Sequence, residues 1–404
     1  MEAAGRMEII RELCSFERRL TGTDAERRAS AAMAERLRGL GRRAEAEPIY
    51  VHPQSALVHA IHCLIGFAGS LVAVSTPALG FGLVLFAATS TYLDLNARLY
   101  LVRSLLFRRA SQNLVSRGGS PDAPARLIVC AHLDAARTGG AFSERRARWF
   151  ARLARSSPVP LGPYRFLFWS MAALVPLLGL RMAGLDSELV SVLQLLPTLV
   201  LLVGAFALVD VQLSAVVPGA NDNASGVATA ISLAGELEAE PPENLDVWVV
   251  LDGGGESLGE GMRAFVRAHR RDFAERSTFF LVLDAVGQGE VRFATGAGAA
   301  VSLGMDRRLI ELSQAIASAD SEGDDRYRAA GYASGLGGDV VPPRLAGFRT
   351  LAITCLDEDG QVANRHLPSD LPAAINLAAL DRAHGFALEL IRRVDADAGR
   401  AGPD

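Results

Sequence analysis

Two long stretches of the chain carry almost no charge, and they dominate its pattern of hydrophobic and polar positions. Between Val51 and Leu93 there is no acidic residue, lysine or arginine, and this is enough chain for two helices of about 20 residues each. A second apolar stretch, Phe166–Leu180 and Leu189–Val209, is divided by a short polar turn. We therefore predict four transmembrane helices in two hairpins. The alternative is a set of helices buried in a soluble core, where uncharged runs of this length are rare. The predicted hairpins span residues 55–96 and 163–210.

Arginines gather at the same end of both predicted hairpins. They follow the first hairpin and precede the second, whereas the turns at the other ends are nearly uncharged. By the positive-inside rule, arginine-rich flanks stay in the cytoplasm. We therefore expect a multi-pass integral membrane protein of the cell membrane whose soluble domain is cytoplasmic. The flanking arginines are Arg98, Arg103, Arg108, Arg109, Arg145, Arg146, Arg148, Arg152, Arg155 and Arg165.

One basic segment before the second hairpin has two interpretations. In Ser143–Ser157, a helix would place Trp149, Phe150 and Leu153 on one side among arginines. Such a helix would lie in the membrane interface. The same composition also suits a basic linker, and the sequence favours neither interpretation.

The remaining segments alternate between short apolar runs and amphipathic stretches. Several apolar runs are continuous rather than alternating, which is typical of parallel strands covered on both faces. The sequence therefore predicts an α/β fold, a three-layer sandwich with a mostly parallel central sheet. The predicted strands are Leu127–Ala131, Leu245–Asp252, Thr278–Ala285 and Arg349–Cys355. The predicted helices are Thr23–Gly41, Asn223–Glu240, Gly259–Phe273, Met305–Ala319 and Ser369–Arg393. This discontinuous domain comprises residues 1–50, 110–140 and 215–404, with both hairpins inserted into it.

Composition changes this picture little. Half of the residues are hydrophobic and the net charge is −4, so nothing indicates a nucleic-acid partner. The four cysteines are far apart and lack the spacing of a cysteine metal site or a disulfide framework. We expect the partners to be the lipid bilayer and a peptide, as substrate or as ligand.

Polar side chains follow each predicted strand. The carboxyl ends of parallel strands meet at one edge of a sheet, where ligands bind, so these side chains are expected to converge there. Taken singly, a carboxylate at a strand end is more often a helix cap or turn residue, and a lone histidine is usually structural. Together, two imidazoles and three carboxylates suit a pair of divalent ions, most naturally zinc. Asp134 is placed to orient the His132 imidazole. The candidate metal ligands are His132, Asp222, Glu256, Asp284 and His366.

The ordered set of motifs resembles the co-catalytic zinc exopeptidases of clan MH. This group includes bacterial leucyl aminopeptidases, glutamate carboxypeptidase and glutaminyl cyclases, and the resemblance covers most of the soluble part. It implies a zinc aminopeptidase-like fold with two Zn²⁺ ions. It also implies a zinc-bound His132 with Asp134 as its partner, a bridging Asp222, and ligands at Asp284 and His366. The motifs that carry the resemblance are RLTGTDAERRA, AHLDA, PGANDNASGVA, LVLDAVG and NRHLPSDLPAAIN.

The fit to this family is poorest after the second strand, in VVLDGGGESLGEG. The family has two consecutive glutamates there, of which the first is the general base and the second binds a zinc ion. The spacing to Gly261 places Glu256 at the second position and Gly255 at the first. The resemblance therefore implies that Glu256 binds metal and that the general base is absent at Gly255. A second difference is Asp339 followed by Val340, where the family often has an Asp-His pair. Substitutes for the base are Glu260, Asp252 or the loop Asp357–Asp359.

Three functions follow from this pattern. The first is a membrane-embedded zinc aminopeptidase that hydrolyses N-terminal peptide bonds with a metal-activated water. Its activity would be impaired by the absent general base, because general-base assistance typically contributes about 10² to 10⁴ in rate. The second is an inactive metal-binding pseudopeptidase that serves as a membrane-tethered binding or scaffold module. The third is another amide reaction such as glutaminyl cyclisation, which needs the same missing glutamate.

Overall fold

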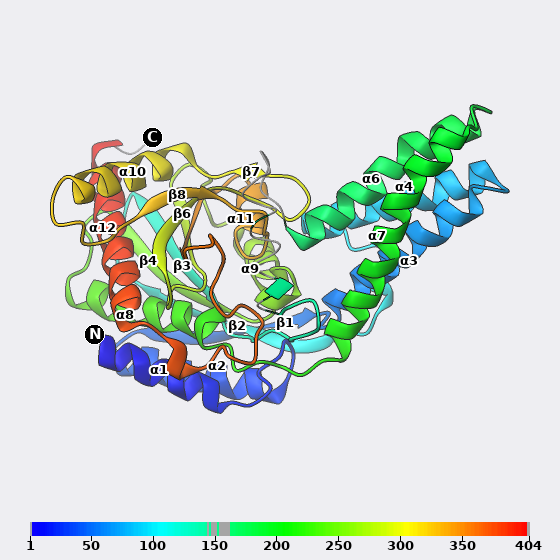
Figure 1. Cartoon of the computed structure of the whole chain (residues 1–404). Coiled ribbons are helices and arrows are strands. Elements are labelled where there is room, and N and C mark those ends of the chain that lie inside the picture. The colour runs from blue at the N-terminus through cyan, green and yellow to red at the C-terminus, as the bar shows by residue number, and fades with distance from the viewer. Residues whose placement is uncertain (1, 144, 147–151, 153–161, 402–404) are drawn as a thin grey trace.

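A sheet-centred domain and a helical bundle that projects from it make up the chain (Figure 1). The computed structural model describes residues 2–143, 145, 146, 152 and 162–401. Most of Ser143–Ser157, the segment with two interpretations, lies outside the described residues. The division into domains stays a prediction.

Four parallel strands form the centre of the sheet, in the order β4-β3-β5-β9. All four are the apolar runs predicted from the sequence, and nearly every side chain in them is buried. Such strands need cover on both faces, which the helices supply. Their bounds are β3 Ala125–His132, β4 Leu245–Asp252, β5 Thr278–Leu283 and β9 Arg349–Leu356.

Antiparallel strands extend the sheet at both sides, so the nine-stranded sheet is mixed. At one side β2 pairs with β4 and β1 pairs with β2; at the other β6 pairs with β9 and β7 pairs with β6. The short β8 runs parallel to β6. These strands were not predicted, because charged and small residues interrupt their apolar pattern. Their bounds are β1 Arg43–Val51, β2 Arg109–Gly118, β6 Glu290–Ala297, β7 Leu303–Gly304 and β8 Ala330–Ala333.

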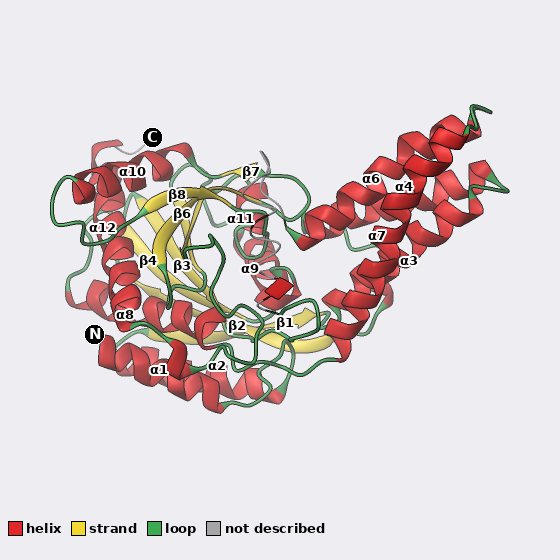
Figure 2. Ribbon diagram, viewed as in Figure 1, coloured by secondary structure: helices red, strands yellow, loops and turns green. Residues whose placement is uncertain are grey.

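Helices cover both faces of the sheet and give the three layers expected of this fold class. The helix α8 packs on β3, β4 and β5, while α9 and α11 lie on the other side of the sheet (Figure 2). Thr23 caps α2 by accepting a hydrogen bond from the Glu26 amide. The helices of this domain are α1 Ala3–Ser15, α2 Asp24–Gly39, α8 Gly226–Ala239, α9 Glu260–His269, α10 Arg307–Ser321, α11 Val341–Leu345 and α12 Leu377–Ala401.

The projecting bundle consists of the four helices of the two hairpins. Each is long and apolar enough to cross a membrane. Only 22–50% of their apolar windows is buried, and leucine, valine, phenylalanine and tryptophan side chains cover the outside of the bundle. Helices buried in a soluble core would not expose so many apolar side chains. Exposed apolar patches mark places that a protein partner or a lipid bilayer covers. The bounds are α3 Ser55–Val72, α4 Pro77–Leu95, α6 Pro163–Met182 and α7 Glu188–Leu213.

A buried cluster of charges joins the first hairpin to the domain. Arg103 and Asp94, at the end of α4, form a two-pronged ion pair with N–O distances of 2.6 and 2.9 Å, and both side chains are fully buried. Arg103 also donates to the Ser257 carbonyl at 3.1 Å and lies 3.5 Å from Glu260. Glu260 in turn accepts from the His52 amide at 2.6 Å. The hairpin is thereby fixed to the loop between β4 and α9.

Removing one partner of this buried pair should destabilise the protein strongly. In Asp94→Asn the buried Arg103 guanidinium loses its two-pronged partner and keeps only Glu260, 3.5 Å away, as a counter-charge. Breaking a buried pair typically costs about 3–5 kcal/mol. We expect a clearly lower melting temperature of the full chain in detergent micelles. Adding Arg103→Gln to Asp94→Asn should recover part of the loss.

The exposed pair Arg307–Glu311 provides the control, because Glu311→Gln should change stability by less than about 1 kcal/mol. Equal melting temperatures for the Asp94→Asn and Glu311→Gln variants would contradict the role given to the buried pair.

Candidate metal centre

The candidate ligands converge at the carboxyl edge of the central strands. His132 is the last residue of β3, and Asp284 directly follows β5. Glu256 lies in the short 3-10 helix η3 Gly255–Ser257 after β4, and His366 lies in the loop after β9. Asp222 lies in the turn η2 Ala220–Ser225 that leads into α8. The topology therefore brings all five predicted residues to one place.

Their contacts form two groups that share the Asp222 carboxylate. One oxygen, Oδ1, lies 3.4 Å from His132 Nε2, which is itself 3.9 Å from Asp284 Oδ1. The other oxygen, Oδ2, lies 3.5 Å from His366 Nε2, which is 3.4 Å from Glu256 Oε2. Ligand atoms of His132, Asp222 and Glu256 all lie within 4.8 Å of one another. Asp222 thus faces one imidazole with each of its two carboxylate oxygens.

Asp134 lies behind His132, as predicted for an orienting residue. Its Oδ1 is 3.3 Å from His132 Nδ1, and its backbone carbonyl is 3.2 Å from the same nitrogen. The carboxylate also accepts the amides of Gly255 and Glu256 at 3.0 and 3.1 Å, and the hydroxyl of Thr21. Because Asp134 contacts both the imidazole and the loop with Glu256, it fixes the two relative to each other.

Buried polar residues hold the loop with Asp222. Asp370 accepts the amides of Asn221 and Asp222 at 2.6 and 3.1 Å, and burial raises the pKa of Asp370 to about 7. The Asn223 amide group donates to the Leu283 carbonyl and accepts from the Ala285 amide, on either side of Asp284.

A buried arginine joins this loop to the end of β3. Arg19 donates to the carbonyls of Leu133 and Gly219 at 2.5 and 3.3 Å. One guanidinium thereby holds both the residue after His132 and the start of the turn that contains Asp222. The sequence predicted the five candidate ligands but gave no signal for Arg19 or for the contacts of Asp370, because both act through backbone groups.

Electrostatics also favour a cation in this centre. Burial alone would lower the pKa of His132, but hydrogen bonds to Asp134, Asp222 and Asp284 outweigh it and raise that pKa well above its usual value. Burial would raise the pKa of Asp222, yet His132 and Arg365 hold it below its usual range. The same concentration of negative charge that attracts a proton to His132 attracts a metal ion.

The residues present fit zinc. Both ring nitrogens of His366 are buried without a hydrogen-bond partner among the described residues, although Nε2 faces two carboxylates. Buried ring nitrogens that make no hydrogen bond are uncommon in proteins. A metal ion between the His366 ring and the two carboxylates would explain them. Two histidines and three carboxylates are ligands that zinc accepts.

Gly255, where the family has its general base, packs directly on His132. A Cβ atom built at Gly255 would lie 2.3 Å from the His132 Cβ and 2.5 Å from its Cγ. No real side chain tolerates such distances, so any residue other than glycine would displace the imidazole. The structure therefore leaves no room beside His132 for a glutamate at position 255.

Three of the predicted substitutes for the base, Glu260, Asp252 and Asp357, are otherwise engaged or deeply buried. Glu260 is bonded to His52 and lies against Arg103. Asp252 is fully buried, and burial and the charge of Asp339 raise its pKa well above its usual value. Burial also raises the pKa of Asp339 to about 7. Asp357 accepts amides of its own turn.

One charged residue of the centre was not predicted as part of it. Arg365, next to His366, places its Nε 3.3 Å from Asp222 Oδ2. The motif NRHLPSD contains it, but a residue beside a ligand carries no signal of its own in the sequence. The centre thus combines acidic groups with one guanidinium.

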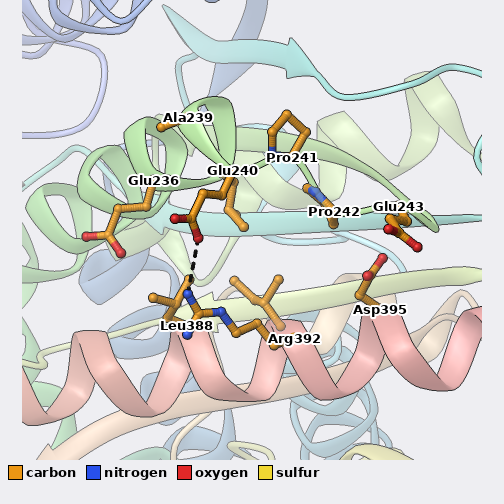
Figure 3. Close-up of a pocket in the computed structure, with 11 residues that line it drawn as sticks. Glu236, Ala239, Glu240, Pro241, Pro242, Glu243, Leu388, Arg392 and Asp395 are labelled. Carbon is orange, nitrogen blue, oxygen red and sulfur yellow. Dashed lines mark ion pairs between the residues drawn. The ribbon is translucent and has the colours of Figure 1, made fainter.

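A surface hollow of about 450 Å³ lies away from this centre, between α8 and α12 (Figure 3). Glu236, Glu240 and Asp395 line it, and Glu240 pairs with Arg392 at 3.5 Å. The hollow precedes β4, at the amino edge of the parallel strands, whereas the candidate ligands lie at the carboxyl edge. It has no part in the metal centre.

Comparisons with known proteins support this description. The model of peptidase family M28 matches residues 202–391, which include four of the five candidate ligands. A search of curated protein sequences found no match. Among solved structures, the glutaminyl cyclase of Fimbriiglobus ruber has a TM-score of 0.55 at 15% identity, covering 97% of this chain and 95% of its own.

Two aminopeptidase structures have the same fold. The zinc aminopeptidase of Bacillus subtilis has a TM-score of 0.55 at 12% identity, covering 97% of this chain and 95% of its own. The leucine aminopeptidase precursor of Bacteroides thetaiotaomicron has a TM-score of 0.53 at 14% identity, with 97% of each chain covered. At these identities the likeness shows the fold. Over residues 202–391 the chain matches peptidase family M28, and its fold is that of zinc aminopeptidases and glutaminyl cyclases.

Proposed function

We propose that this chain is a membrane-embedded zinc aminopeptidase that hydrolyses N-terminal peptide bonds slowly. The observation that carries the proposal is the position of Asp222, with one carboxylate oxygen toward His132 and the other toward His366. A carboxylate shared in this way suits two zinc ions. The matched family and the zinc aminopeptidases of the same fold support the reaction class.

Each residue has a definite task in this proposal. His132, Asp222 and Asp284 would hold one ion, and Asp222, Glu256 and His366 the other. Bound zinc would polarise the scissile carbonyl and lower the pKa of a water molecule. Asp134 keeps the His132 ring in position through Nδ1. Since no carboxylate occupies position 255, the proton of the water passes to solvent or another base, and the rate is correspondingly low.

The helical bundle is the part of the chain that would lie in the membrane. Four apolar helices with an apolar outer surface suit a lipid bilayer. The arginines at the ends of the hairpins favour a cytoplasmic domain. Because the second hairpin is inserted between His132 and Asp222, the centre would lie close to the membrane surface.

The packing of Gly255 on His132 favours a second candidate function. A backbone that excludes any side chain at the position of the base also suits a pseudopeptidase, which binds zinc and a peptide without cleaving it. Metal content and activity distinguish the two candidates.

The first prediction concerns metal and activity together. The purified full chain should contain two zinc ions, and His132→Ala or His366→Ala should lower the zinc content measured by plasma emission. The zinc-loaded chain should release N-terminal residues from a broad panel of aminoacyl substrates, and a chelator should abolish the release.

His269→Ala is the matched control, because this histidine contacts Glu47 outside the centre and its loss should leave zinc unchanged. Zinc without any hydrolysis would support the pseudopeptidase. Unchanged zinc in both ligand variants would refute both candidates.

The second prediction concerns position 255. Because a Cβ there collides with His132, Gly255→Glu should not restore fast hydrolysis. Both Gly255→Glu and Gly255→Ala should weaken zinc binding, by roughly tenfold or more as for other changes that disturb a ligand's orientation. Titration with a zinc-selective dye measures the affinity.

Gly39→Ala serves as the control, since a Cβ at Gly39 meets nothing within 4 Å. A Gly255→Glu variant with strong peptidase activity would show that the native centre lacks only its base, contrary to the geometry.

The third prediction concerns orientation in the membrane. A green fluorescent protein fused to the C-terminus should fluoresce, whereas alkaline phosphatase at the same place should be inactive, since the domain is expected in the cytoplasm. Phosphatase fused after Ser75, in the turn between α3 and α4, should be active. The opposite pattern would reverse the proposed topology.

A further inference from the structure

The guanidinium of Arg365 lies at the edge of the metal centre, and some of its N–H groups donate no hydrogen bond to a described residue. Its Nε is 3.3 Å from Asp222 Oδ2, and 32% of the side chain is exposed. Among the described residues, Asp222 is the one side chain with which Arg365 forms a hydrogen bond or ion pair, and both Nη groups are without an acceptor. Neither Nη is among the buried atoms that lack a partner, so both reach solvent.

Metal loading would change what Arg365 faces. Asp222, Glu256 and Asp284 carry three negative charges between them, and two divalent cations would more than neutralise these. The fixed positive charge of Arg365 would then have no counter-charge among the ligands. A guanidinium is always protonated and its planar donors match a carboxylate, so an anionic group of a substrate would supply the missing partner.

The position of Arg365 limits where that anionic group lies. The guanidinium contacts the same Asp222 oxygen that faces His366, so it is within one residue of the bond that the centre would cleave. Phe142 packs on the His366 ring, with centroids 4.5 Å apart, and thus adds an apolar wall beside the cation.

Building on the proposed function, we propose that Arg365 selects substrates with a carboxylate within one residue of the scissile bond. Two sources supply this chemistry, namely an acidic side chain on the N-terminal residue or the C-terminal carboxylate of a dipeptide. In both cases the carboxylate accepts hydrogen bonds from the Nη groups of Arg365. A substrate with a cationic side chain at that position is disfavoured by like charge.

Binding calorimetry on the zinc-loaded full chain in micelles tests this. One pair of probes is L-aspartic acid α-amide and L-asparagine α-amide, which differ in a side-chain carboxylate. The other pair is leucylglycine and leucylglycinamide, which differ in a C-terminal carboxylate. We expect the anionic member of one pair to bind at least about tenfold more tightly, because charge-assisted hydrogen bonds are the stronger ones. The pair that shows the preference identifies the source.

Arg365→Gln should reduce that preference to less than about twofold without loss of zinc, and Arg365→Lys should retain part of it. Arg307→Gln is the control, because this arginine is on α10 with 94% of its side chain exposed. Equal affinities within both pairs for the parent, or an unchanged preference in Arg365→Gln, would overturn the proposal. So would a rise in zinc content in Arg365→Gln, because Arg365 would then occupy the place of an ion.

The binding test separates this inference from the proposed hydrolysis. An anion preference that depends on Arg365, in a chain that releases no N-terminal residue, supports the subsite and refutes the aminopeptidase. Hydrolysis without any anion preference supports the aminopeptidase and refutes the subsite.

Discussion

Like charges converge at one edge of the sheet, and the rest of the centre is built around this constraint. Carboxylates at such short distances repel one another unless protons or cations lie among them. Asp222 is the most central of these carboxylates, because each of its oxygens faces an imidazole. The buried bonds from Asp370 and Arg19 hold the surrounding loops in place against the repulsion. A metal centre explains why the chain keeps so many acids together.

Both hairpins join the rest of the chain next to the candidate ligands. The first is bonded through Asp94 and Arg103 to the loop with Glu256, and the second interrupts the chain between His132 and Asp222. A fully buried ion pair at this junction is costly to form unless both charges are paired and hydrogen-bonded. The bundle is therefore continuous with the ligands rather than a remote anchor.

The glycine at position 255 is held between two residues of the centre. Its amide donates to Asp134 and its α-carbon lies against His132. A glutamate there needs space that the imidazole occupies. The close packing on His132 leaves no room at position 255 for the side chain that the family resemblance implies there.

Much of the architecture follows from local pattern. The continuous apolar runs determined the four central strands, and the long uncharged stretches determined the four helices of the bundle, because burial and length act within each segment. The candidate ligands were recognisable since four of them end or follow a strand whose carboxyl end faces the same edge, and Asp222 lies at the start of a helix. The antiparallel strands β1, β2 and β6 were not recognisable, because their stability comes from pairing with neighbours rather than from their own pattern. Only the tertiary structure showed that Gly255 touches His132, that Arg103 lies under the loop with Glu256, and that Arg365 reaches Asp222. These contacts join residues far apart in the chain, and the distances between such residues are decided by packing, not by sequence.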